Sequence, residues 1–238
     1  MWRRVFDPAL TNRYLQTAIM LLYYITDRTQ LADHEPARRA QLLARIAEAA
    51  RCGVDYIQLR EKDLAARQLE SLAREALRAV RDNSARTRLL INSRTDVALA
   101  VGADGVHLRS DDVSASETRA LLARAGLPQM LLTVSCHTST EVVRAEAGGA
   151  NFGVFGPVFE KPGGESITAG LDALRKVCDR TALTVKRMPV LALGGVTTEN
   201  AAHCVKAGAA GVAGIRLFQQ GDSAEVVRGL RAEGKGQK

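Results

Sequence analysis

Two patterns of apolar positions alternate along the chain from residue 20 onward. One is a short, mostly apolar run, which is typical of a strand buried on both faces. The other is a longer stretch with apolar residues three and four positions apart, which is typical of a helix packed against a sheet. The short runs lie at residues 21–26, 54–60, 88–92, 105–108, 131–136, 152–156, 189–194 and 211–218.

The helical period is clearest after the second short run, where the apolar positions are Leu69, Leu72, Ala73, Ala76, Leu77 and Val80. Eight strand–helix units in succession predict a parallel sheet with crossover helices. A doubly wound open sheet would usually have fewer strands and a GxGxxG turn after the first one, and no such turn follows Thr26. We therefore predict an α/β fold, a single (β/α)8 barrel.

The length of 238 residues and the hydrophobic content of 46% suit one undivided barrel. Residues 1–19 carry charged side chains with no steady period, so we interpret them as an extension outside the core fold. The catalytic barrel is expected to occupy residues 20–233, and residues 234–238 form a short tail.

The net charge of +7 does not point to nucleic acid, because the basic residues are scattered over helix-like segments and only 4% of the residues are aromatic. An acidic small molecule is the favoured substrate. The four cysteines have no metal-ligand spacing, which indicates reduced thiols and a cytoplasmic location. No apolar run approaches the roughly 20 residues that cross a bilayer, so no membrane partner is expected.

The chemistry of such a barrel lies at the carboxyl ends of its strands. Gln58, Arg60 and Lys62 recur at every second position there, which places them on one face of an extended segment. Two cations at that spacing suit an anion with several oxygens. The alternative is an ordinary solvated strand end.

A second candidate site follows the seventh strand at Gly194 and Gly195, where glycine lets backbone N–H groups approach a phosphate closely. The alternative is a tight turn that needs glycine without any ligand. Arg216, which we expect to end the eighth strand, favours the phosphate site.

Two further candidates each have an equally simple structural explanation. Asp111 and Asp112 could bind Mg²⁺, Asp112 more plausibly, or could stabilise the start of the next helix. His137 could act as a general acid or base, or could cap a strand end in its loop.

The sequence resembles the thiamine phosphate synthase family and its sister family, the thiazole tautomerases, over about residues 20 to 220. The resemblance rests on Tyr24-Ile25-Thr26-Asp27, Gln58-Leu59-Arg60-Glu61-Lys62, Leu90-Ile91-Asn92, Val101-Gly102-Ala103-Asp104-Gly105-Val106-His107-Leu108, Ser135-Cys136-His137-Thr138, Phe155-Gly156-Pro157-Val158-Phe159 and Ala192-Leu193-Gly194-Gly195-Val196.

The resemblance implies a barrel enzyme that joins hydroxymethylpyrimidine pyrophosphate to thiazole phosphate with Mg²⁺, giving thiamine phosphate and pyrophosphate. The side chains that would hold the pyrimidine pyrophosphate are Gln58, Arg60, Lys62 and Asn92. Asp112 would bind Mg²⁺, Ser135 would lie near the pyrimidine, and the backbone of Gly194 and Gly195 would receive the thiazole phosphate. Arg60, Lys62, Ser135 and His137 are accordingly the expected catalytic residues.

The chain departs from the family pattern at four places. Ser93 stands where the family usually has a second metal-binding aspartate, and Arg109-Ser110 replaces a glutamine. Lys161, our candidate for the lysine that reaches the pyrophosphate, lies in an altered loop at residues 160–164. Arg216 replaces a serine at the end of the eighth strand.

These departures leave three functions open. The synthase is favoured because Gln58, Arg60, Lys62 and Asp112 persist. A thiazole tautomerase would use a histidine at the position of His137. A non-catalytic protein could bind a thiazole phosphate and convert nothing. The partners expected in each case are small phosphorylated compounds, and the oligomeric state, a homo-oligomer included, is left open.

Overall fold

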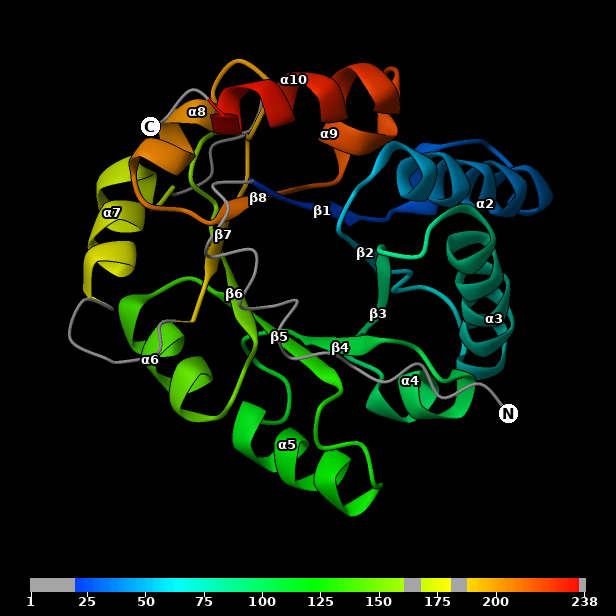
Figure 1. Ribbon diagram of the computed structural model, residues 1–238. Coiled ribbons are helices and arrows are strands. Elements are labelled where there is room, and N and C mark those ends of the chain that lie inside the picture. The colour runs from blue at the N-terminus through cyan, green and yellow to red at the C-terminus, as the bar shows by residue number, and fades with distance from the viewer. Residues whose placement is uncertain (1–19, 161–167, 181–187, 236–238) are drawn as a thin grey trace.

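The computed structural model describes residues 20–160, 168–180 and 188–235, and within them eight parallel strands close into a barrel (Figure 1). The strands pair in sequence order, and the last pairs with the first, with Leu21 opposite Gly211. They are β1 (Leu21–Ile25), β2 (Tyr56–Leu59), β3 (Arg88–Asn92), β4 (Gly105–Leu108), β5 (Leu131–Cys136), β6 (Phe152–Phe155), β7 (Val190–Leu193) and β8 (Gly211–Gly214). The predicted (β/α)8 barrel is confirmed.

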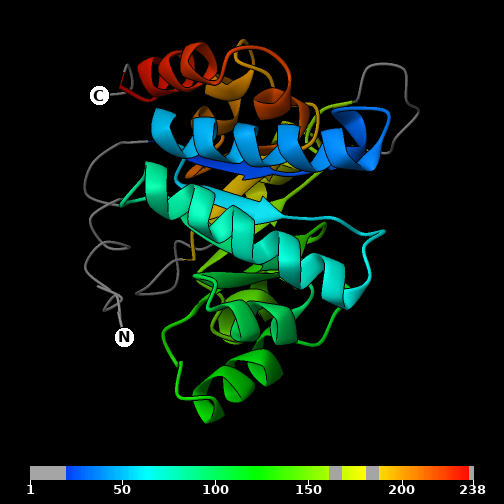
Figure 2. The same cartoon turned by 90° about the vertical axis from the view of Figure 1, so that its right-hand side faces the viewer.

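Helices surround the barrel on its outer side, and Figure 2 shows the first two long ones packed side by side across the outside of β1 and β2. The longer helices are α2 (Glu35–Cys52), α3 (Ala66–Asn83), α5 (Ala115–Arg124), α6 (Ser139–Ala147), α7 (Gly170–Arg180) and α10 (Ser223–Lys235). The shorter ones are η1 (Arg28–Gln30), α4 (Thr95–Val101), α8 (Ala201–Lys206) and α9 (Arg216–Gln219).

The apolar residues form two cores, because the strands are buried on both faces. One core lies between the sheet and the helices, and α3 contributes the six apolar positions predicted from its period. The other fills the barrel interior, where Tyr23 makes edge-on contacts with Tyr56 and Phe152 at ring-centroid distances of 6.1 and 5.6 Å. The interior is therefore solid below the carboxyl ends of the strands.

The prediction of an eighth strand over residues 211–218 is wrong for the second half of that range. Strand β8 ends at Gly214, and α9 begins at Arg216. Phe218 and Gln219 of this short helix are buried. An apolar run of a few residues does not distinguish a strand from a buried helical turn, and here the two follow one another directly.

Residues 1–19, which we interpreted as an extension, lie outside the described residues, as do residues 236–238 of the expected tail. In the described part of the chain, no helix combines the length and the apolar character needed to cross a membrane.

Candidate active site

A cavity of about 1430 Å³ opens at the carboxyl ends of the strands. It brings together most of the predicted site residues, namely Gln58, Arg60, Lys62, Asn92, Ser135, His137, Gly194, Gly195 and Arg216. Asp112 is not among the lining residues, although its neighbour Asp111 is. Lys161 lies outside the described residues.

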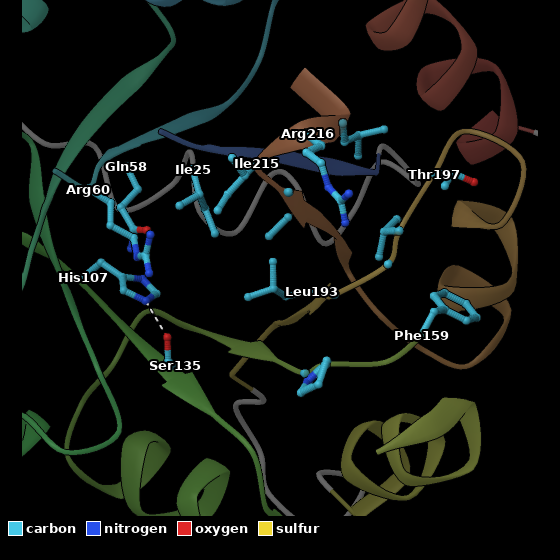
Figure 3. Close-up of a pocket in the computed structure, with 18 of the residues that line it drawn as sticks. Ile25, Gln58, Arg60, His107, Ser135, Phe159, Leu193, Thr197, Ile215 and Arg216 are labelled. Carbon is cyan, nitrogen blue, oxygen red and sulfur yellow. Dashed lines mark hydrogen bonds between the residues drawn. The ribbon is translucent and has the colours of Figure 1, made fainter. Parts of the chain in front are cut away.

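The cavity has two polar ends with apolar side chains between them. Gln58, Arg60, His107 and Ser135 gather at one end in Figure 3, and Thr197 and Arg216 lie toward the other. Ile25, Leu193 and Ile215 are among the side chains drawn between them. This layout suits ligands whose polar groups lie at the two ends of the cavity and whose flat apolar rings lie between them.

Two cations face one space at the first end. Arg60 directly follows β2, and its backbone N–H donates to the Thr26 hydroxyl oxygen at 3.0 Å. The Arg60 charge lowers the pKa of the Lys62 ammonium, with smaller contributions in the same direction from burial and from Arg109. Like charges this close favour binding of an anion, which removes their mutual repulsion.

The loop that carries these cations is fixed by the residue between them. Glu61 is 5% exposed, accepts a 2.5 Å hydrogen bond from the Thr26 hydroxyl, and lies 3.2 Å from Arg28 Nη1. The Arg28 guanidinium also donates two hydrogen bonds to Asp63, at 2.6 and 2.9 Å. Burial raises the pKa of Glu61, and the Thr26 hydroxyl and Arg28 oppose that effect. This network is not evident from the sequence, because Glu61 stands between two cavity cations.

Gln58 supplies a polar atom that needs a partner. The side chain is 1% exposed, and its amide nitrogen makes no full hydrogen bond among the described residues, although Gln58 is close enough to the Tyr23 hydroxyl to lower the pKa of that group. Burying such a donor is unfavourable unless it is hydrogen-bonded. Because Gln58 lines the cavity, an acceptor atom of a ligand would satisfy it.

His107 is a site residue that the sequence candidates omitted. Its Nε2 lies 2.8 Å from Ser135 Oγ, and its Nδ1 lies 2.8 Å from Thr133 Oγ1 and 3.1 Å from the Tyr23 hydroxyl. Burial, with help from the Arg60 charge, lowers the pKa of His107 to about 3, so the ring is neutral near pH 7. One nitrogen then donates and the other accepts, which fixes the orientation of the Ser135 hydroxyl. In the sequence, the indication of such a role was a lone histidine inside an apolar strand.

His137 contacts the cavity from the loop after β5. Its Nδ1 lies 2.6 Å from the carbonyl oxygen of Gly156, which can only accept, so this nitrogen carries a hydrogen. In the neutral ring Nε2 is then an acceptor. The cap role and the acid–base role are both compatible with this placement.

The backbone at the second end of the cavity requires glycine at positions 194 and 195. Gly194 and Gly195 have φ values of 97° and 62°, and a Cβ on Gly195 would lie 2.6 Å from the carbonyl oxygen of Glu160. Phe159 N–H donates to the Gly194 carbonyl oxygen at 3.0 Å. Within the described part of the chain, nothing accepts a hydrogen bond from the N–H groups of Gly195 and Val196. The turn therefore needs glycine, and it also leaves two donors for an anion.

The carboxylates near the cavity suit a metal ion only partly. Asp112 Oδ2 accepts from the Arg109 backbone N–H at 2.7 Å, and Asp111 forms an ion pair with the Arg109 side chain. Among the described residues, no three His, Cys, Asp or Glu side chains converge on one point. Such a donor set fits an Mg²⁺ that takes most of its ligands from water and phosphate oxygens.

Comparisons with known proteins agree on one family. Residues 22–218 match the family model described as thiamine monophosphate synthase. A Geobacter sulfurreducens protein provisionally named thiamine-phosphate synthase is 43% identical over 218 residues, which are 89% of this chain and 92% of the relative. The thiamine-phosphate synthase of Methanoculleus marisnigri is 37% identical over 213 residues, or 88% of this chain and 93% of its own.

A solved structure supports the same conclusion. Thiamine phosphate pyrophosphorylase from Pyrococcus furiosus superimposes with a TM-score of 0.73 at 27% identity. The superposition covers 93% of this chain and 98% of the other.

Proposed function

This chain belongs to the thiamine monophosphate synthase family, and we propose that its cavity joins hydroxymethylpyrimidine pyrophosphate to thiazole phosphate. The products are thiamine phosphate and pyrophosphate, so the enzyme is a transferase of a pyrimidinylmethyl group. The observation that carries this function is one cavity that combines a cationic end, an apolar middle and an amide-lined end. Each end suits one anionic group of one substrate.

The pyrophosphate belongs at the cationic end, with Arg60, Lys62 and Asn92. When the bond between the methylene carbon and the pyrophosphate oxygen breaks, the electron pair leaves with pyrophosphate. Arg60 and Lys62 stabilise the charge that develops there. The thiazole nitrogen then bonds to the methylene carbon. The sequence of steps needs no protein nucleophile.

The pyrimidine ring belongs beside Gln58 and Ser135. The unpartnered Gln58 amide nitrogen would donate to a ring nitrogen, and the Ser135 hydroxyl, oriented by His107, would contact the same ring. These contacts orient the methylene carbon toward the second substrate. The aminopyrimidine itself delocalises the positive charge that forms.

The thiazole phosphate belongs at the glycine turn. The N–H groups of Gly195 and Val196 point to no acceptor in the described residues, and Arg216 lines the cavity beside them. Leu193 and Ile215 would flank the thiazole ring. The phosphate is thereby held away from the departing pyrophosphate.

Asp112 stays the predicted residue for Mg²⁺, with Asp111 beside it. Asp112 accepts the Arg109 amide through Oδ2, and no other residue in the described part of the chain bonds to Oδ1, which could therefore bind a metal ion. Bound Mg²⁺ would add positive charge against the leaving pyrophosphate.

The decisive experiment measures thiamine phosphate formation from both substrates, with and without Mg²⁺, beside a tautomerisation assay on the thiazole alone. Arg60→Ala should lower synthesis at least about a hundredfold, the scale expected when a charge partner of the transition state is lost. Arg94→Ala is the matched control, because Arg94 pairs with Asp96 and does not line the cavity. Wild-type turnover in Arg60→Ala would remove this end of the cavity from the mechanism.

A further inference from the structure

Arg109 is a cation of the cavity to which the reaction described above assigns no role. It follows β4, and its side chain lines the same cavity as Arg60 and Lys62, which follow β2. Strand β3 lies between β2 and β4 in the barrel, so the three cations that line this cavity come from the two sides of β3. The only carboxylate that pairs with Arg109 in the described residues is that of Asp111.

We propose that Arg109 is a third pyrophosphate-binding cation, and that its ion pair with Asp111 is exchanged for pyrophosphate oxygens when the anion binds. The inference rests on the proposed function for the identity of the anion. It adds a binding residue and a competing carboxylate to that site.

The ion pair with Asp111 is weak enough to be exchanged. The side chains of Arg109 and Asp111 are 50% and 64% exposed. Exposed pairs of this kind contribute only about 0 to 1 kcal/mol, because water screens them. Pyrophosphate carries several charges and presents oxygens to a guanidinium fork, so it is the stronger partner.

The charge of Arg109 already acts on Lys62. The pKa of Lys62 is lowered by Arg60, by burial and then by Arg109, and Asp27 and Asp111 oppose these effects. The groups therefore share one electrostatic environment. An anion placed among them interacts favourably with all three cations at once.

The backbone holds the base of the Arg109 side chain in place. Its N–H donates to Asp112 Oδ2 at 2.7 Å, and the N–H of Asp112 donates back to the Arg109 carbonyl oxygen at 3.3 Å. This closed turn limits where the guanidinium can reach. Because the Arg109 and Asp111 side chains are exposed, we expect the guanidinium to exchange one partner for the other by side-chain rotation.

The test is calorimetric binding of inorganic pyrophosphate in the presence of a chelator, so that no divalent ion contributes. Arg109→Gln should weaken binding about tenfold, which corresponds to about 1.4 kcal/mol. Arg109→Lys should recover part of the loss, and Asp111→Asn should tighten binding a few-fold because it removes the competitor. Arg94→Gln is the matched control, since Arg94 pairs with Asp96 at the same two-residue spacing and lies outside the cavity lining.

The inference is wrong if Arg109→Gln binds pyrophosphate like the wild type, or if Arg94→Gln weakens binding equally. Unchanged or weaker binding by Asp111→Asn would refute the exchange. A wild-type protein that binds no pyrophosphate without a divalent ion would overturn this inference, and the proposed function is decided separately by thiamine phosphate formation in the presence of Mg²⁺. A protein that binds pyrophosphate through Arg109 but forms no thiamine phosphate would refute the proposed function alone. Urea unfolding of each variant verifies that it is folded.

Discussion

The buried His107 makes protein stability depend on pH in a way that one substitution should remove. Its folded-state pKa of about 3 lies below the ordinary value of 6.5, because burial disfavours the charged ring. Between these two values the unfolded chain binds a proton that the folded protein does not. The stability contributed by the neutral ring is therefore complete above pH 6.5, and it is lost as the pH falls from there toward 3.

The size of this effect follows from the shift. Each pH unit within the window costs about 1.4 kcal/mol of unfolding free energy for one such group. From pH 6.5 to pH 4.5 the wild type should therefore lose about 2 kcal/mol through His107 alone, because the unfolded ring is already half protonated at pH 6.5. His107→Gln has no ring to take up this proton. Over the same pH range its unfolding free energy should therefore fall less than that of the wild type, and the difference should equal the contribution of His107.

The assay is urea unfolding at several pH values between 7 and 4.5, comparing how the unfolding free energy falls in each protein. The absolute stability of His107→Gln at pH 7 does not enter the comparison, because only the change with pH is used. His203→Gln, which alters an exposed histidine on α8, should retain the wild-type dependence. If His107→Gln loses stability as steeply as the wild type, the ring is protonated in the folded protein and does not orient Ser135 as a neutral group.

Three further substitutions test other parts of the site. Arg28→Ala should lower the unfolding free energy by about 3 to 5 kcal/mol, because it leaves the buried Glu61 carboxylate without its cation. Arg39→Ala, which breaks a more exposed pair, should cost about 1 kcal/mol or less by the same urea assay, and equal losses would contradict the argument. Gly195→Ala should raise the KM for thiazole phosphate about tenfold or more, the effect of roughly 1 to 3 kcal/mol of backbone strain, and an unchanged KM would contradict the phosphate site. His137→Ala should leave most of the synthesis rate, whereas a loss of about a hundred- to ten-thousandfold would indicate the acid–base role that a tautomerase needs.

The side chains at the rim of the barrel could be predicted by combining the geometry of a strand with that of a closed barrel. Alternation along a strand places Gln58 and Arg60 on the same side, and closure of a parallel barrel brings all carboxyl ends to one rim. Ser135 and Gly194 come from β5 and the turn after β7, and the structure places them around the same cavity. The convergence of distant segments thus followed from the fold class alone.

The internal partners of the site could not be predicted, because they depend on side-chain directions after each strand ends. Glu61 stands between two cavity cations in the sequence, yet it is buried against Thr26 and Arg28. Arg216 was assigned to a strand and belongs to a short helix, although it still lines the cavity. An apolar run and a charged residue do not reveal such choices without the surrounding packing.

The two ends of the cavity differ in a way that matches the charge changes of the reaction. At the pyrophosphate end the leaving oxygen gains negative charge in the transition state, so Arg60 and Lys62 bind the transition state more tightly than the substrate. At the glycine end the thiazole phosphate keeps its charge throughout, so neutral N–H groups beside Arg216 bind substrate and transition state alike. Loss of a cation at the first end should therefore lower kcat, and damage to the glycine turn should raise KM. The opposite pattern in Arg60→Ala and Gly195→Ala would mean that the two substrates bind the other way round.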